Sequence, residues 1–291
     1  MHKLMIEAAI NELTSKEQNP NVPYGPEEVA RDAIACAKAG ATIVHFHARD
    51  ADTGQQLWDG IETYAKAIKL IRRECDAILY PTYRSGVPKE QRIAHVVALA
   101  DDPDARLELA TLDLGATNTG APDARAGEAR AGAYVNTHQD VVYFMQTLRE
   151  HGVFYSLGVR DVGHMRHIRA YAEMGLVSSP WVVKIFMSEE DPHGPLPDAR
   201  GLMMYLDMVP PGIDCHWFVT TYKSPTTHAR VNMLAAAMGG HIRTGLGDNP
   251  VLDGKVLTNA QQVELAVELA HKAGRDVASP ADARKMMGMV S

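Results

Sequence analysis

The chain has 291 residues, 46% of them hydrophobic, and its 29 basic and 36 acidic side chains give a formal net charge of −7. This composition is typical of a globular protein, and the small acidic excess argues against a nucleic-acid-binding surface. The three cysteines, Cys36, Cys75 and Cys215, are odd in number and far apart, so we expect no disulfide framework and no structural zinc ribbon.

The sequence contains no run of about 18 apolar residues of the kind that crosses a membrane. Near the N-terminus, Glu7 interrupts the apolar residues too early for a secretory signal. We therefore expect no membrane partner and a cytoplasmic location, where unpaired cysteines stay reduced.

Short apolar runs alternate with longer segments of helical period along the sequence, which is the pattern of repeated strand–helix units. The intervening helices are expected at about residues 25–40, 61–74, 89–100, 139–151, 165–174, 198–208, 227–238 and 259–272. The eight apolar runs are Leu4–Ile10, Ala41–His47, Ala77–Thr82, Leu107–Leu114, Val153–Val159, Trp181–Met187, Cys215–Thr221 and His241–Leu246.

Eight strand–helix units, in a chain close to the roughly 250 residues typical of the fold, predict a (β/α)8 TIM barrel. We expect residues 1–291 to form one such α/β domain. A doubly wound sheet is the alternative, but Asn11 and Glu12 follow the first apolar run where such folds usually carry a glycine-rich fingerprint.

One segment interrupts this alternation. Residues 115–138 are rich in glycine, alanine and charge and have no apolar period. We interpret them as a long loop after the fourth strand, which is either functional or an entropic filler.

The second expected strand ends in two histidines, His45 and His47. In a TIM barrel the active site lies at the carboxyl ends of the strands. Side chains two residues apart on a strand point to the same face, so both imidazoles can reach one metal ion. The alternative is that they simply cap the strand.

Other polar residues follow the ends of the expected strands. After the eighth, Arg243 can hold an anionic substrate, and Asp248 can act as a base or orient Arg243; an ordinary buried ion pair is the alternative. The first, third and fourth strands supply further candidates: Glu7, Asn11, Glu12, Thr82, Thr117 and Asn118.

With these motifs the sequence resembles the β-keto acid cleavage enzyme family over nearly its whole length. The motifs that carry the resemblance are Ala8-Ala9-Ile10, residues 19–23 with Pro26-Glu27-Glu28, residues 39–49 around the two histidines, residues 110–115, residues 239–243, Asp248-Asn249, and the tail from Gly274-Arg275 to Ala283-Arg284.

The resemblance implies a zinc-dependent barrel, a homo-oligomer (dimer or tetramer), that condenses a β-keto acid with acetyl-CoA to give acetoacetate and an acyl-CoA. It implies that His45 and His47 bind the zinc ion, that Arg243 and Asp248 form a catalytic pair, and that Thr82 helps to hold the substrate.

The sequence departs from the family at the third zinc ligand, a glutamate directly before the strand-eight aspartate, where this chain has Gly247. Because strand one lies beside strand eight in a closed barrel, we expect Glu7 to replace that ligand, with Glu12 as second choice. The alternative is that Glu7 pairs with an arginine.

The family's acidic pair in the strand-five segment is also absent, and Arg160 follows that segment instead, which favours a neutral or anionic substrate side chain. The expected substrate-binding residues are Asn11, Glu12, Thr117, Asn118 and Arg160. Two other functions stay open: a CoA-independent, metal-dependent lyase of retro-aldol type, and a barrel that binds a small molecule without catalysis.

Overall fold

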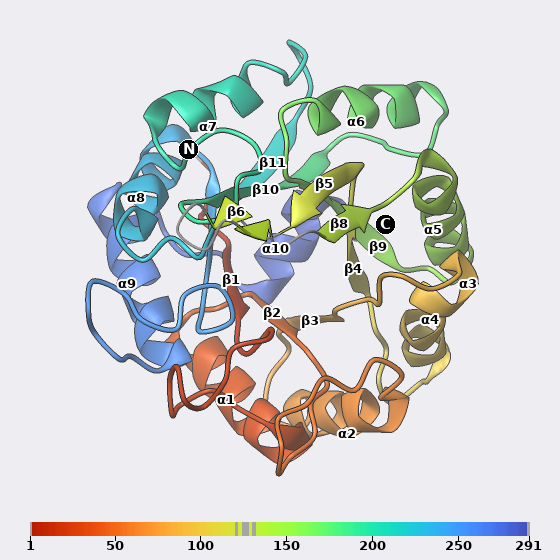
Figure 1. Cartoon of the computed structure of the whole chain (residues 1–291), viewed down its shortest axis with the longest axis vertical. Helices are drawn as coiled ribbons and strands as arrows, with labels where there is room; N and C mark the ends of the chain where they lie inside the picture. Colours follow the sequence, from red (N-terminus) through yellow and green to blue (C-terminus); the bar gives the residue numbers. More distant parts are fainter. Residues whose placement is uncertain (1, 120–121, 124–127, 130–131, 290–291) are drawn as a thin grey trace.

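The computed structural model describes residues 2–119, 122–123, 128–129 and 132–289. Eight parallel strands form one sheet, in the order β3-β2-β1-β12-β11-β10-β9-β4, that curls into a nearly closed barrel (Figure 1). The predicted TIM-barrel fold is therefore confirmed. The eight strands are β1 (Ile6–Ala9), β2 (Ile43–Phe46), β3 (Ile78–Pro81), β4 (Leu109–Asp113), β9 (Phe154–Val159), β10 (Trp181–Ser188), β11 (Cys215–Tyr222) and β12 (His241–Thr244).

Helices surround the sheet, and several begin at the signals present in the sequence (Figure 1). Thr137 and Thr258 each form a capping box with the side chain three residues later, which satisfies free N–H groups at the helix start. No helix in the described part of the chain is long and apolar enough to cross a membrane. The helices are α1 (Gly25–Ala39), α2 (Ile61–Arg72), α3 (Lys89–Arg92), α4 (Ala94–Asp101), α5 (His138–Glu150), α6 (His164–Glu173), α7 (Ala199–Leu206), α8 (His228–Met238), α9 (Asn259–Lys272) and α10 (Pro280–Met287).

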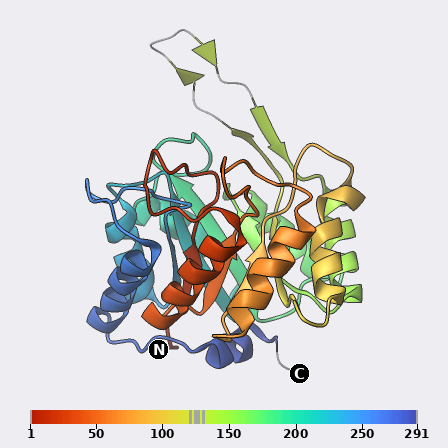
Figure 2. The same ribbon diagram turned by 90° about the horizontal axis from the view of Figure 1, so that it is seen from below.

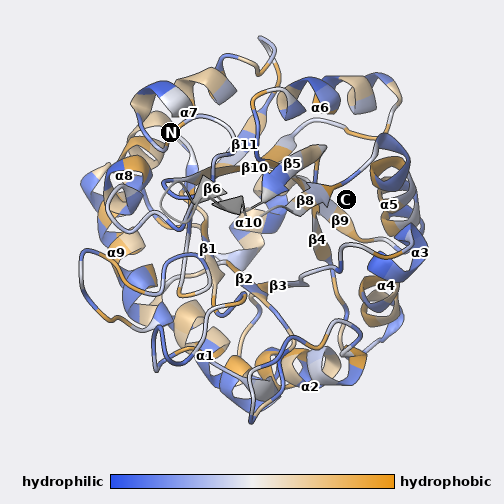
Figure 3. Ribbon diagram, in the orientation of Figure 1, coloured by the Kyte–Doolittle hydropathy of each residue, from blue (hydrophilic) through white to orange (hydrophobic). Residues whose placement is uncertain are grey.

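Most of the core lies in two clusters of buried apolar residues. Apolar side chains on the outer face of the sheet pack against the inner faces of the helices, whose outer faces are hydrophilic (Figure 3). A smaller cluster around Met5, Ile43, Leu109 and Phe218 fills the barrel near the amino ends of its strands. The helix α10, which the sequence analysis does not predict, packs there through Ala283 and Met287.

The residues that point into the barrel change from apolar to polar along the strands. Two residues beyond Met5 and Ile43 stand Glu7 and His45, and two beyond Val182 stands Lys184. Because strand side chains alternate with period two, each of these residues points to the same side as its apolar neighbour. The barrel is therefore closed by apolar residues at one end and lined by polar residues towards the other.

The expected loop at residues 115–138 is instead a β-arm that projects beyond the carboxyl ends of the strands (Figure 2). The antiparallel pair β5 (Ala116–Thr119) and β8 (Gly132–Val135) forms its base, and β6 (Pro122–Asp123) pairs with β7 (Glu128–Ala129) further out. This ladder satisfies backbone hydrogen bonds without fully burying a face of the arm, so the segment lacks an apolar period. The rest of its tip lies outside the described residues.

Candidate active site

A cavity of about 410 Å³ opens at the carboxyl ends of the barrel strands. This is the end of a TIM barrel at which active sites lie. Eight of the residues predicted from the sequence line it: Glu12, His45, His47, Thr82, Thr117, Arg160, Arg243 and Asp248. Three others, Glu7, Asn11 and Asn118, do not line it.

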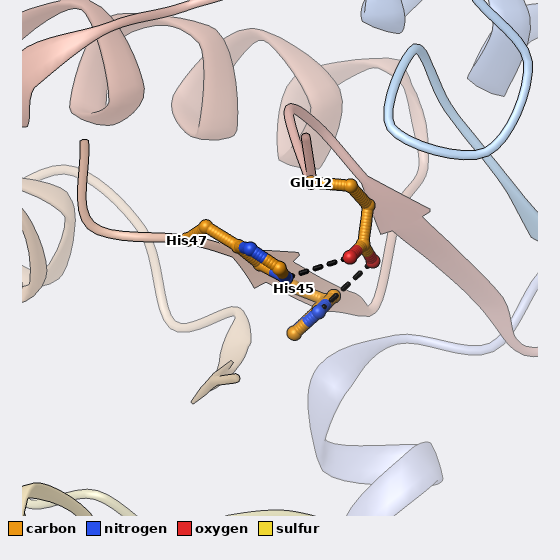
Figure 4. A group of neighbouring side chains, drawn as sticks. All are labelled: Glu12, His45 and His47. Carbon is orange, nitrogen blue, oxygen red and sulfur yellow. Dashed lines mark ion pairs between the residues drawn. The ribbon is translucent and has the colours of Figure 1, made fainter. Parts of the chain in front are cut away.

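Glu12, His45 and His47 form a group whose potential ligand atoms all lie within 4.8 Å of one another (Figure 4). The Oε1 atom of Glu12 is 3.0 Å from Nε2 of His45, and Oε2 is 2.6 Å from Nε2 of His47. Both histidines are buried at the end of β2. Glu12 reaches them from the turn that follows β1.

Hydrogen bonds fix the orientation of both imidazole rings. Nδ1 of His45 lies 3.1 Å from the carbonyl oxygen of Tyr80, and Nδ1 of His47 lies 2.7 Å from Oε1 of Gln56. Because these oxygens can only accept, each Nδ1 carries a hydrogen, and in a neutral ring Nε2 then presents a lone pair to Glu12. Such outer contacts are typical of metal-binding histidines.

Two imidazole lone pairs that face a carboxylate need a cation between them. Burial lowers the pKa of His45, which disfavours the proton as that cation. Nε2 of His47 is buried and has no hydrogen-bond partner among the described residues, although the Glu12 carboxylate is close. This donor set of two imidazoles and one carboxylate fits a metal ion of the zinc type.

Glu12 occupies space that Gly247 leaves free. A Cβ atom on Gly247 would lie 2.4 Å from Cγ of Glu12 and 3.0 Å from the carbonyl oxygen of Ala9. Glu12 itself has a φ of 39°, in the left-handed region that residues other than glycine rarely adopt. The turn after β1 therefore directs the Glu12 carboxylate back over the strand end, towards the histidines.

Glu7 lies deeper in the barrel and is not part of this group. Its Oε1 accepts from the hydroxyl of Tyr80 at 2.5 Å and from Nη1 of Arg243 at 3.1 Å, and its Oε2 is 2.7 Å from Nζ of Lys184. Burial alone would raise the pKa of Glu7, but Lys184 and Arg243 hold it below its usual value. The expectation that Glu7 replaces the third ligand is thus not supported: Glu7 pairs with Arg243, its neighbour in the β1–β12 register, and Glu12 is the carboxylate beside the histidines.

Arg243 connects the barrel centre to the cavity. It donates from Nε and Nη2 to the two oxygens of Asp248, both at 2.8 Å, and its Nη2 also donates to Oε1 of Glu12 at 2.5 Å. Burial raises the pKa of Asp248 in spite of this contact, which makes the carboxylate a stronger base. The Arg243 guanidinium group therefore binds both the carboxylate of Asp248 and the carboxylate of Glu12 that faces the histidines.

The two other predicted residues outside the cavity have different positions. Asn11 clamps the neighbouring strand: its Nδ2 donates to the carbonyl oxygen of His47 at 3.0 Å, and its Oδ1 accepts from the His47 N–H at 2.8 Å. It thus positions His47 rather than contacting the cavity. Asn118 lies exposed on the β-arm.

Two buried charged residues near the site, Asp113 and Lys184, were not among the residues expected from the sequence. A signal for Lys184 was present, because it is the single charged residue within the apolar run Trp181–Met187. Asp113 likewise lies within the fourth run, two residues after Thr111, and both of these side chains line the cavity.

Comparison with known proteins gives the family. Residues 3–289 match the model of the beta-keto acid cleavage enzyme family. A 3-keto-5-aminohexanoate cleavage enzyme of Fusobacterium nucleatum subsp. nucleatum is 33% identical over 298 aligned residues, which cover 99% of each chain. A 3-dehydrocarnitine:acetyl-CoA trimethylamine transferase of Rhizobium meliloti is 26% identical and covers 93% of this chain and 91% of its own.

Among solved structures, the ternary complex of ObcA with a C4-CoA adduct and oxalate superposes with a TM-score of 0.71 at 17% identity. The match covers 92% of this chain and 68% of the ObcA chain, and at this identity it supports the fold alone. The family match and the full-length relatives go further: the chain belongs to the β-keto acid cleavage enzyme family and is an enzyme that acts on β-keto acids.

Proposed function

We propose that this enzyme is zinc-dependent and condenses a β-keto acid with acetyl-CoA, giving acetoacetate and an acyl-CoA. The observation that carries the proposal is the Glu12–His45–His47 group next to the Arg243–Asp248 pair in one cavity. The names of relatives that use acetyl-CoA support the choice of co-substrate.

The zinc ion would be held by Nε2 of His45, Nε2 of His47 and the Glu12 carboxylate. When bound, zinc acts as a Lewis acid towards the oxygens of a β-keto acid. Tyr80 and Gln56 keep the two imidazoles in the tautomer that leaves Nε2 free. Gly247 leaves the room that Glu12 needs.

The exchange balances without a redox partner. The bond between C2 and C3 of the β-keto acid breaks, a new bond joins C2 to the carbonyl carbon of the acetyl group, and the remaining acyl group passes to the CoA sulfur. Asp248 would take the C2 proton and return it to C2 after the C2–C3 bond has broken, since its raised pKa and its fixed position beside Arg243 suit a general acid–base group. Arg243 stays cationic and orients the Asp248 carboxylate throughout.

The test is an isotope experiment with the purified enzyme. Zinc, a panel of β-keto acids and acetyl-CoA labelled with ¹³C in both acetyl carbons are incubated together, and acetoacetate is analysed by NMR. We expect label at C3 and C4 of acetoacetate, because the acetyl group supplies those carbons. Unlabelled cleavage products that form equally well without acetyl-CoA would instead indicate a CoA-independent lyase.

Asp248→Asn should lower kcat in this assay by about 10² to 10⁴, the usual contribution of a general base. Asp207→Asn, a matched change of an exposed aspartate at the end of α7, should leave kcat unchanged. Equal activity of the two variants would exclude Asp248 as the base.

A further inference from the structure

The side of the cavity formed by β4, β9 and β10 is built differently from the metal side. Asp113 ends β4, Arg160 follows β9, and His193 lies in the segment after β10; all three line the cavity. We refer to Asp113, Arg160 and His193 as the β4–β9 wall. If the proposed function holds, this wall faces the part of the β-keto acid that distinguishes one substrate from another.

The two charges of the β4–β9 wall are already paired with each other. Nη2 of Arg160 lies 3.3 Å from Oδ2 of Asp113. The guanidinium carbon of Arg160 also lies 4.4 Å from the ring centre of Phe186 and 5.5 Å from that of Tyr134 on the β-arm. These rings and the Asp113 carboxylate hold Arg160 in place, so the wall is neutral overall.

Three polar atoms of the β4–β9 wall have no hydrogen-bond partner among the described residues, although Asp113 and Arg160 are paired. Oδ1 of Asp113, Nε of Arg160 and Nε2 of His193 are buried and have no hydrogen-bond partner within the described ranges. Nδ1 of His193 faces the carbonyl oxygen of Arg160 at 3.2 Å and therefore carries the hydrogen, which leaves Nε2 as an acceptor. The wall thus holds one free donor and two free acceptors on residues that line the cavity.

From these contacts we infer that the enzyme selects β-keto acids with an uncharged polar side chain, such as a hydroxyl or a carboxamide. A hydroxyl can donate to Asp113 or His193 and accept from Arg160 at the same time. A carboxylate would have to displace Asp113 from Arg160, and an ammonium group would face the Arg160 guanidinium. Either change leaves a buried charge without its partner, which is strongly unfavourable.

The test compares acids of closely similar size. They are 5-hydroxy-3-oxohexanoate, 5-amino-3-oxohexanoate, the unsubstituted 3-oxohexanoate and 3-oxoadipate, and kcat/KM is measured for each with acetyl-CoA. We expect the hydroxy acid to exceed each of the others by about tenfold or more, since a buried polar site discriminates against partners that leave it unpaired. A tenfold preference for 5-amino-3-oxohexanoate or for 3-oxoadipate would overturn the inference.

Two substitutions should change the preference in opposite directions. Asp113→Asn leaves Arg160 without its counter-charge, so kcat/KM for 3-oxoadipate should rise relative to the hydroxy acid. Arg160→Gln leaves Asp113 without its counter-charge, so 5-amino-3-oxohexanoate should gain instead. A merely structural role for the pair would lower activity with all four acids alike, and that result would also contradict the inference.

Two further variants guard against misfolding and general effects. Arg160→Lys keeps the positive charge, so kcat/KM for 5-amino-3-oxohexanoate should stay as low as in the wild type. Arg169→Gln removes an exposed arginine that pairs only with Glu173 among the described residues of α6, and it should leave the order of the four acids unchanged.

The failure of the proposed function is distinguishable from the failure of this inference. If the wild-type enzyme turns over none of the four acids, the proposed reaction is wrong, and calorimetry of their binding to the zinc-loaded protein then tests the wall directly. Tighter binding of the hydroxy acid than of either charged acid supports the inference. Equal or reversed affinities overturn it.

Discussion

Two glycines of this site, Gly247 and Gly158, leave space that neighbouring carboxylates occupy. A Cβ atom on Gly247 would collide with Glu12, and a Cβ on Gly158 would lie 1.9 Å from Oδ1 of Asp113. In both cases a carboxylate fills the space above a glycine: Glu12 comes from the turn after β1, and Asp113 from the end of β4. The two glycines therefore permit the positions of the carboxylate on the metal side and the carboxylate on the β4–β9 wall.

The substitution Gly247→Ala tests this relation on the metal side. The new methyl group would displace Cγ of Glu12, so we expect zinc affinity to fall by about 10- to 100-fold, as for other losses of ligand orientation. Affinity is measured by competition with a fluorescent chelator, and circular dichroism reports the fold.

Gly163→Ala is the matched control, because a Cβ there would meet only Oδ1 of Asp161, at 3.2 Å. Unchanged zinc affinity in the Gly247→Ala protein would mean that Glu12 does not depend on the space above Gly247.

The role of Glu12 could not be predicted from strand periodicity. Glu7, Ala9 and Asn11 share one face only while the strand continues, and β1 ends at Ala9. The left-handed turn at Glu12 then redirects the chain, and nothing in the local sequence gives its direction. His45, His47 and Arg243 were predictable because they lie on strands or directly after them, where the period of two applies. Asp248 lies beyond the end of β12, and it was predicted from its nearness to Arg243 in the sequence.

At the scale of the elements, a buried histidine joins α8 to the sheet. The ring nitrogens of His228 lie 2.6 Å from Oγ1 of Thr221 on β11 and 3.1 Å from Oγ1 of Thr244 on β12. Burial lowers the pKa of His228 to about 4. The side chain is therefore neutral in the folded protein at physiological pH.

His228 should make the protein less stable in acid. Its pKa in the unfolded chain is near 6.5, so the unfolded state binds more protons than the folded state between about pH 6.5 and pH 4. The free energy of unfolding is not reduced by His228 above pH 6.5. It falls as the pH drops through this window, by about 3 kcal/mol in all. Urea unfolding at pH 7.5 and pH 4.5 measures the loss.

In His228→Gln the difference in unfolding free energy between the two pH values should shrink by this amount, whatever the absolute stability of the variant. His271→Gln, at the exposed end of α9, should retain the wild-type difference. An unchanged pH dependence in His228→Gln would show that another group causes the acid loss.

The elements themselves were largely predictable, with two instructive exceptions. The eight barrel strands were found because their apolar runs are buried on both faces and stand between clear helix signals. The β-arm was taken for a loop because no face of its ladder is fully buried: Tyr134 is only half-buried beside the cavity, and Val135 is exposed. The helix α10 lacks a strong apolar stripe, although Ser279, Pro280 and Asp282 supply a complete N-terminal cap.

For the whole molecule, the barrel gathers opposite charges at its centre. The carboxylates of Glu7, Glu12 and Asp248 face the cationic side chains of Lys184 and Arg243. The carboxylates therefore outnumber the cations within this network of described residues, and the excess negative charge lies at the cavity. A divalent cation beside Glu12 would offset that excess, which agrees with the proposed metal centre.

The measurement that tests this account most directly is the zinc content of three proteins purified with zinc and then dialysed: wild type, Glu12→Gln and Glu7→Gln. We predict about one zinc ion per chain for the wild type and for Glu7→Gln, and a large loss of zinc from Glu12→Gln, because Glu12 completes the site with His45 and His47. Full zinc occupancy in Glu12→Gln, or its loss only from Glu7→Gln, would contradict the assignment of the metal centre.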